Sequence, residues 1–359
     1  MNKRGALSRR GRARPAAVRT ALAGAAFLAF CPSLAAGQSI ATEVDVTAGY
    51  STEDVSAGAT QLRALGEGPR AIRFFGEVAW GARYFPQSRP QSPTDVFGTA
   101  YPYANRAKVI EAYAERTFRP GGALISVRGG RFRTPFGFSS RSDHAYTGFL
   151  RAPMIRYDNY FALSNNFLEH GADVIAGVPR AYMEASVSRP SDVGEVQRRP
   201  GFDTVIRGQM YFPSTTIGVS HYRAKPYQPE FFAKGHAVFT GVDVRWMSNG
   251  VQLRGEFLAG RPFDGTTTTG GYIDLSVHRV AMGPVTAIAR IERLDYDTIP
   301  EFVLFSRRAM VGGRIRLPRG LTAQIAAGHQ WRQQIQRDRT AFDFALTYSV
   351  RHAIDTRRQ

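Results

Sequence analysis

A strict alternation of apolar and polar side chains is the feature that most limits the fold of this 359-residue chain. The clearest example is AFDFALTYSVR at 341–351, where one side carries Phe342, Phe344, Leu346, Tyr348 and Val350 and the other carries Asp343, Ala345, Thr347, Ser349 and Arg351. Successive side chains of a β-strand point to opposite faces of a sheet, so a period of two indicates a strand with one apolar and one polar face. Because a strand in a two-sheet sandwich looks similar, the rest of the chain has to separate the two folds.

The same alternation recurs along the chain between turn residues. The other segments are 41–50, 70–84, 106–118, 122–132, 169–178, 181–189, 204–212, 215–223, 237–248, 250–260, 270–280, 285–295, 307–317 and 321–331. These make fifteen strands, and since single-chain bacterial barrels have an even number, we expect a sixteenth within 54–66 or 154–165. We expect the threonine-rich stretch 264–271 to be an exposed loop.

The polar faces carry charges in strand after strand, and this separates a barrel from a sandwich. Burying many ionised groups in a shared dry core would be prohibitive, so this face must meet water. Aromatic residues near strand ends fit interfacial girdles; they are Tyr84, Phe85, Tyr211, Phe212, Trp246, Trp331 and Tyr348. A closed barrel also removes the unpaired sheet edges that lipid cannot tolerate. We therefore predict an all-β protein, a transmembrane antiparallel β-barrel of about 16 strands, with a secreted all-β protein as the alternative.

The N-terminal segment has the features of an export signal. Residues 1–37 contain seven basic residues and no acidic one, then a short apolar run and small residues, which is the pattern of a secretory signal peptide. We place cleavage between Gly37 and Gln38, so the lone Cys31 is discarded and the remaining chain keeps +11 of the full formal charge of +18. The rest, 38–359, contains no apolar run long enough for a spanning helix. It is expected to form one domain in the bacterial outer membrane.

The longest stretch without clear alternation follows the segment at 122–132. Long loops in compact domains are usually functional or disordered, and the aromatic content here argues against disorder. We expect a long loop at about 133–168, of which 138–165 or a part folds into the barrel and narrows it. The residues expected near the constriction are Arg141, Arg151 and Arg156. An extracellular loop that points outward is the alternative.

The segment 129–177 resembles outer-membrane porins of the phosphate-selective O and P type. In that family a G-[RQ]-[FY]-x-x-P-F turn precedes a Ser/Thr-containing sequence, an aromatic stretch with arginine and then a strand. The matching positions are Gly130, Arg131, Phe132, Pro135, Phe136, Gly137, Ser142, Phe149, Leu150, Arg151 and Gly171. The resemblance implies a porin, a water-filled channel for small hydrophilic solutes. The acidic residues that commonly follow the turn are replaced by GFSSRS, and the basic residues are mainly arginine, so the resemblance supports a porin more firmly than phosphate selectivity.

The polar faces predict which charges line the pore. The arginine candidates are Arg207, Arg245, Arg254, Arg290, Arg314 and Arg316, and the acids expected on the same side include Asp243 and Glu256. Guanidinium groups stay charged and bind phosphate or carboxylate, so an arginine-rich lumen should favour anions. The alternative is that these arginines pair with the acids, which would give a non-selective general porin.

An enzyme is a weaker interpretation, since some barrels carry hydrolytic sites. The candidate residues are Ser142, Asp143 and His144 together, or His221 and His278 with nearby acids. We find no nucleophile elbow, HExxH, cysteine pair or phosphate-binding glycine loop. We therefore predict no enzyme, no cofactor and no metal site, and keep a barrel-based outer-membrane hydrolase as a less favoured alternative.

The basic composition, with a pI of about 10.5, also raises the question of nucleic acid. The arginines are spread over alternating strand faces and loops and form no single stripe, so we predict no nucleic-acid binding. The expected partners are outer-membrane lipid, lipopolysaccharide and small hydrophilic or anionic solutes. The sequence leaves open whether the barrel assembles as a homotrimer.

Overall fold

The structure, a computed structural model, describes residues 39–53, 55–84, 107–138, 149–151, 153–156, 168–190, 202–224, 236–261, 267–278, 284–299, 302–332 and 338–355. The predicted signal peptide at 1–37, with its Cys31, lies outside these residues. Among the described residues, no helix has the length and apolar character that a membrane span requires.

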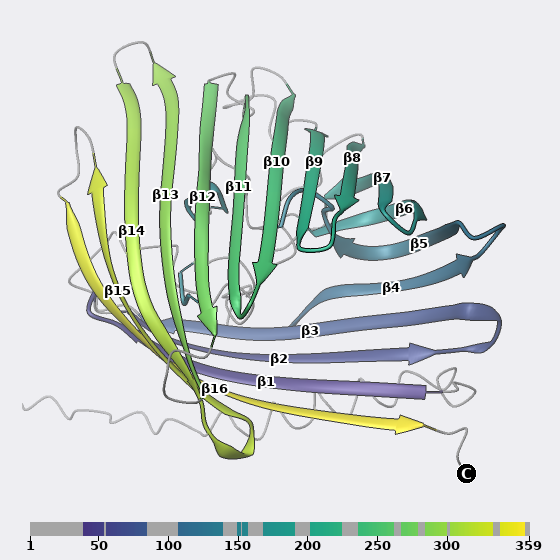
Figure 1. The fold of residues 1–359 in the computed structure, drawn as a ribbon, viewed down its shortest axis with the longest axis horizontal. Coiled ribbons are helices and arrows are strands. Elements are labelled where there is room, and N and C mark those ends of the chain that lie inside the picture. The colour runs from purple at the N-terminus through teal and green to yellow at the C-terminus, as the bar shows by residue number, and fades with distance from the viewer. Residues whose placement is uncertain are drawn as a thin grey trace, which may run out of the picture.

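The strands form one closed antiparallel barrel, in which each strand pairs with its neighbours in sequence (Figure 1). They are β1 (Ser39–Ser51), β2 (Val55–Glu67), β3 (Ile72–Tyr84), β4 (Lys108–Phe118), β5 (Leu124–Arg133), β6 (Leu168–Val178), β7 (Ala181–Pro190), β8 (Asp203–Tyr211), β9 (Thr215–Ala224), β10 (Ala237–Ser248), β11 (Val251–Arg261), β12 (Thr267–His278), β13 (Val285–Ile299), β14 (Phe302–Arg316), β15 (Leu321–Arg332) and β16 (Arg339–Asp355). The barrel is closed by β1 and β16, which pair from Ser39 opposite Asp355 to Ser51 opposite Asp343.

The predicted all-β barrel of sixteen strands is confirmed, and the missing strand is β2, within the expected 54–66. The alternative position, 154–165, begins with a single 3-10 turn, η3 (Met154–Arg156). The expectation of an exposed loop at 264–271 is wrong from Thr267 onward, because β12 starts there and Thr268 is fully buried. Threonine is a good strand former, so a threonine run bordered by glycines fits a strand as well as a loop.

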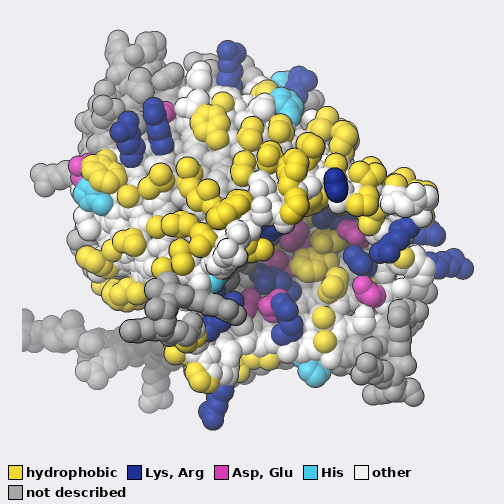
Figure 2. All heavy atoms as spheres, viewed as in Figure 1, with side chains coloured by type: hydrophobic (Ala, Val, Ile, Leu, Met, Phe, Trp, Pro, Cys, Tyr) yellow, Lys and Arg dark blue, Asp and Glu magenta, His cyan; other side chains and the backbone are white. Residues whose placement is uncertain are grey.

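The two faces of the wall differ in polarity as the alternation predicts. Outward side chains are mainly apolar and exposed, for example Val311 at 63% and Ile291 at 60%. Side chains at the alternate positions point inward, and many are charged and buried, such as Arg207 and Asp343. Figure 2 shows apolar side chains over much of the outer surface and both acidic and basic side chains gathered in a hollow.

The connections differ between the two ends of the barrel. The four longest connections follow the odd-numbered strands β3, β5, β7 and β9, whereas the even-numbered strands lead into turns of six residues or fewer, such as Asn249–Gly250 between β10 and β11. Two of the short turns contain a 3-10 turn, η2 (Pro69–Ala71) and η4 (Pro318–Gly320). We call these the long-loop end and the short-turn end. Barrels of outer-membrane type have the same asymmetry, with short turns on the periplasmic side.

Candidate functional site

The described part of the β5–β6 connection packs against the inner face of the barrel through apolar side chains. Phe136, Met154 and Ile155 of the connection are almost fully buried. They form one cluster with inward residues of β8 to β13, namely Val205, Tyr222, Ala224, Ala237, Phe239, Leu258, Tyr272 and Leu294. Apolar contact of this kind excludes water, so this side of the lumen is filled by protein.

Backbone amides of the same connection donate hydrogen bonds to polar side chains of the wall. The amide of Gly137 donates to Ser220 Oγ at 3.1 Å, and that of Phe138 to Glu256 Oε2 at 3.1 Å. Further along, the amide of Met154 donates to Glu292 Oε2 at 2.6 Å. Hydrogen bonds to a charged acceptor are stronger than neutral ones, so the two glutamates are the firmer anchors.

Gly137 fits the turn after β5 for two separate reasons. Its φ of 55° lies in the left-handed region, which costs glycine nothing. A Cβ at this position would also lie 1.9 Å from Glu256 Oε1, so any side chain would displace the anchoring carboxylate. The Pro-Phe-Gly motif therefore places the Phe136 ring in the apolar cluster while the next amides reach the wall.

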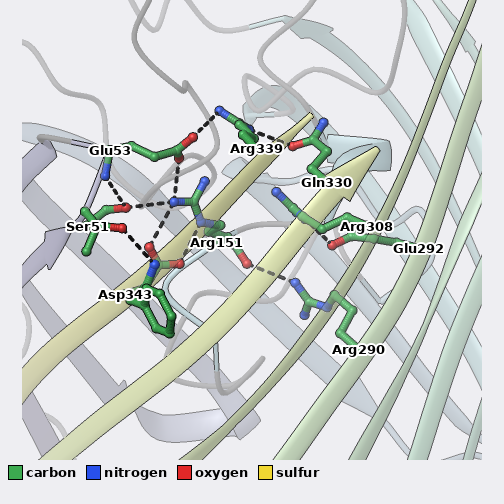
Figure 3. A network of polar contacts seen from close by, with 11 residues as sticks. Ser51, Glu53, Arg151, Arg290, Glu292, Arg308, Gln330, Arg339 and Asp343 are labelled. Carbon is green, nitrogen blue, oxygen red and sulfur yellow. Dashed lines mark hydrogen bonds and ion pairs between the residues drawn. The ribbon is translucent and has the colours of Figure 1, made fainter. Parts of the chain in front are cut away.

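Arg151 links the β5–β6 connection to the part of the wall where β1 and β16 meet (Figure 3). Its guanidinium donates to both carboxylate oxygens of Asp343, at 2.6 and 2.9 Å, and to Ser51 Oγ at 2.8 Å. It lies 2.6 Å from Glu53 as well, and its side chain is 3% exposed. Two carboxylates and a hydroxyl thus hold one buried guanidinium, which is the condition under which a buried charge is tolerated.

The carbonyl of Arg151 is held in addition by Arg290 of β13. Arg290 donates to this carbonyl at 2.9 Å and to both oxygens of Asp274, at 2.5 and 2.9 Å. Its guanidinium also lies over the rings of Phe149 and Tyr272, 4.7 and 5.4 Å from their centroids. Arg290 therefore acts in this structure as a support for the connection.

Two of the other predicted pore-lining arginines are equally buried and paired. Arg207 donates to Asp243 at 2.8 Å and to Ser220 at 3.1 Å, and Arg254 donates to Asp274 at 2.5 Å. The Arg207–Asp243 pair is neutral and contributes little to the field in an aqueous path, whereas Arg254 shares Asp274 with Arg290. These contacts agree with the alternative from the sequence, in which the arginines pair with the acids.

The other three predicted arginines lie near the short-turn end. Arg245 and Arg314 are half-buried and Arg316 is exposed. Arg314 lies opposite Thr286 on one side and Gln324 on the other, and all three belong to the inward set. Among the described inward residues between Asp274 and the short turns of β10–β15, none carries a carboxylate. The β10–β15 side of this mouth is therefore positively charged.

The wall from β1 to β7 carries the opposite balance. Each of two arginines contacts two carboxylates, Arg128 with Asp173 and Glu184 and Arg133 with Glu77 and Glu111. Arg63 contacts Glu43, Asp45 and Glu77 as well. Six carboxylates thus accompany three guanidinium groups in this cluster, which lowers the anion preference expected of the lumen as a whole.

The remaining predicted site residues are only partly described. Of the constriction candidates, Arg141 lies outside the described residues, and Arg156 is described only as the last residue of η3. Ser142, Asp143 and His144 also lie outside them. His221 and His278 lie on β9 and β12, with β10 and β11 between them, and contact Thr240 and Thr286 at 3.0 and 3.3 Å.

Sequence reasoning did not predict that Glu53, Glu292 and Asp343 hold the β5–β6 connection, although it placed Glu292 and Asp343 on polar strand faces, and it missed the apolar residues that contact the connection. One signal for the apolar set was present. Val205, Phe239 and Leu258 interrupt the polar face of their strands, and an apolar side chain there has to pack against something inside the barrel.

Comparison with solved structures identifies the class of protein to which this fold belongs. No family model and no curated protein match this sequence. Among solved structures, OprB of Pseudomonas putida superposes with a TM-score of 0.61 at 10% identity, covering 88% of this chain and 93% of that one. OmpF of Salmonella typhi, in complex with daunomycin, superposes with a TM-score of 0.59 at 8% identity, covering 88% of this chain and 98% of that one. An anion-selective porin from Comamonas acidovorans superposes with a TM-score of 0.57 at 11% identity, covering 88% of this chain and 98% of that one.

The chain therefore has the closed sixteen-stranded barrel fold of bacterial outer-membrane porins. Because only about one residue in ten is identical, the similarity to these structures shows the fold alone.

Proposed function

We propose that this protein is an outer-membrane porin, exported by a cleaved signal peptide, whose lumen conducts small hydrophilic solutes. The observation that carries the proposal is the β5–β6 connection, which is held against the inner face of a closed barrel at Ser220, Glu256, Glu292 and, through Arg151, Asp343. A segment held in this way narrows the lumen without needing to close it. Arg151 is then a residue of the constriction, as the sequence predicts, and it acts as an anchor.

Planar-bilayer recording of the refolded protein tests this function directly. We expect discrete, ohmic conductance steps with the kinetics of an open channel. Steps that close in groups of three would indicate a trimer, and single steps would indicate a monomer. A folded, heat-modifiable barrel that inserts without any conductance would contradict the proposal.

We further propose a weak preference for anions, which originates at the short-turn mouth. Arg245, Arg314 and Arg316 supply the exposed or half-exposed positive charge there, whereas Arg207 is buried in a pair with Asp243 and Arg254 is buried against Asp274. The anion-selective porin among the structural neighbours agrees with this sign. Nothing in this arrangement resembles a dedicated phosphate site, so the phosphate-selective type is supported by its motif alone.

Reversal potentials in a KCl gradient measure this preference. We expect Arg314→Glu with Arg316→Glu to shift the reversal potential toward cations. Two unit charges about 4 Å apart in water interact by about 1 kcal/mol, so each unit of charge is expected to change the permeability ratio by roughly fivefold. Arg116→Glu is the matched control, because Arg116 lies near the same end but on the outer face, over the ring of Phe118. An equal shift in the control, or a cation-selective wild type, would refute the assignment.

A further inference from the structure

Apolar side chains line the inner face of the barrel at the short-turn end of β2 to β4. Leu65, Phe75 and Tyr113 occupy inward positions, and Phe75 lies directly opposite Leu65 on one side and Tyr113 on the other. The centroids of the Phe75 and Tyr113 rings are 5.3 Å apart, and Leu65 is 39% exposed. Deeper in the lumen the same strands carry charges, such as Arg63 and Glu77. An apolar edge therefore borders the aqueous path at this end of the barrel.

The apolar edge continues along the short-turn end of β5 to β8. Its further members are Leu124, Ile175, Tyr182 and Tyr211, each at an inward position of its strand. The rings of Tyr182 and Tyr211 stack with their centroids 6.0 Å apart. Leu124 and Tyr211 are 37% and 38% exposed. We call the two sets together, one side chain on each strand from β2 to β8, the apolar row.

The apolar row is not covered as other inward apolar residues are. Val205, Phe239 and Leu258 are almost fully buried in the cluster that contacts the β5–β6 connection. Among the described residues, no member of the row belongs to that cluster. Apolar surface that stays in water forgoes the free energy of burial, and a contiguous exposed patch of it commonly marks a binding site. The row therefore offers a surface to the apolar part of a solute in the lumen.

The opposite side of the same mouth carries positive charge. By strand order, β10 to β15 lie across the lumen from β2 to β7, and Arg245 and Arg316 lie near their short turns. Beside the row itself, the acids Glu67 and Glu115 are both register partners of Arg73. Arginine and carboxylate thus alternate on the apolar side, and the positively charged surface faces it from across the mouth.

We propose that the short-turn mouth binds organic carboxylates that have an apolar body, of which benzoate is a simple aromatic example. The proposal rests on the proposed function, since the row borders the path that solutes would take through the lumen. The arginines raise the local concentration of anions. The apolar row then retains those anions that can remove apolar surface from water. A small anion such as acetate gains the first effect and little of the second.

Partial block of the chloride current in planar bilayers tests this site. Benzoate added to a constant KCl solution should lower the single-channel current saturably. We expect its half-maximal concentration to be about eightfold lower than that of acetate, since covering about 50 Å² of apolar surface corresponds to roughly this factor. Benzylammonium carries the same ring with the opposite charge and should need a higher concentration than benzoate. Equal potency of the two would refute the assignment to carboxylates.

Leu65→Ser with Phe75→Ser should bring benzoate to the potency of acetate. Phe74→Ser is the matched control, because Phe74 is the adjacent residue of the same type on the outer face, 36% exposed. The control should keep the wild-type ratio of the two concentrations. A wild-type ratio in the double variant, or an equal loss in the control, would overturn the site. Should the double variant fail to fold, Phe75→Ser alone replaces it, with a smaller loss expected.

The KCl current separates this inference from the proposed function. A folded barrel that conducts no KCl current would refute the proposed function and this inference together. A channel that conducts KCl but responds to benzoate as it does to acetate would refute this inference alone.

Discussion

Replacing Arg151 by methionine is expected to detach the β5–β6 connection from the region where β1 and β16 meet and to raise the single-channel conductance. The substitution leaves Asp343 in a buried site without its guanidinium, whereas Glu53 keeps Arg339. Removing one partner of a buried ion pair costs about 3–5 kcal/mol, which corresponds to roughly a hundredfold to several thousandfold in the equilibrium between attached and detached states. The strands keep their backbone hydrogen bonds, so the barrel itself should remain folded.

Hydrogen exchange at the Met154 amide provides the structural measurement, since this amide donates to Glu292 only while the connection is attached. We expect faster exchange at Met154 and unchanged exchange in the strands. Arg339→Met is the control. Arg339 contacts the same Glu53, at 3.0 Å, but it also donates to Gln330 of the wall at 2.7 Å. If Arg151→Met left both the conductance and the Met154 exchange at wild-type values, Arg151 would not be the anchor.

Replacing Phe136 by alanine is expected to release the other end of the same connection. The ring is 1% exposed and lies edge-on to Tyr222, with centroids 6.4 Å apart. Truncating a buried phenylalanine costs about 3–5 kcal/mol through lost transfer energy and the cavity left behind. The loss falls on the contact between the connection and β8–β13, so the Gly137 and Phe138 amides should exchange faster and the conductance should rise.

Phe344→Ala is the matched control, because Phe344 is the same residue type on the outer face, 43% exposed. It should leave exchange at Gly137 and Phe138 unchanged. Phe136→Leu should give an intermediate result, because it keeps most of the apolar volume. If the Gly137 and Phe138 amides were as well protected from exchange in Phe136→Ala as in the wild type, the apolar cluster would not be what holds the connection.

The assignment of side chains to the two faces could be predicted, and most of the candidate residues followed from it. Arg207, Arg254 and Asp243 point inward because their parity is fixed once a strand is recognised. Their partners could not be predicted in the same way. Arg207 and Asp243 are 36 residues apart in sequence and lie on β8 and β10, so their contact across β9 depends on the register of three strands.

The sequence by itself determined the class of fold, the approximate positions of fifteen of the sixteen strands and which side chains point outward. The reason is that alternation is a local property: each strand carries its own period of two and needs no partner to display it. Only the tertiary structure decided what the β5–β6 connection contacts. Arg151 meets Asp343 across 192 residues of sequence, and no periodicity encodes such a contact. The same holds for the pairing that turns Arg254 and Arg290 from expected pore charges into buried supports that share Asp274. Closure of the barrel creates the site of the Arg151 contact, because it brings β1 to β16. The register of β11, β12 and β13 creates the contacts of Asp274.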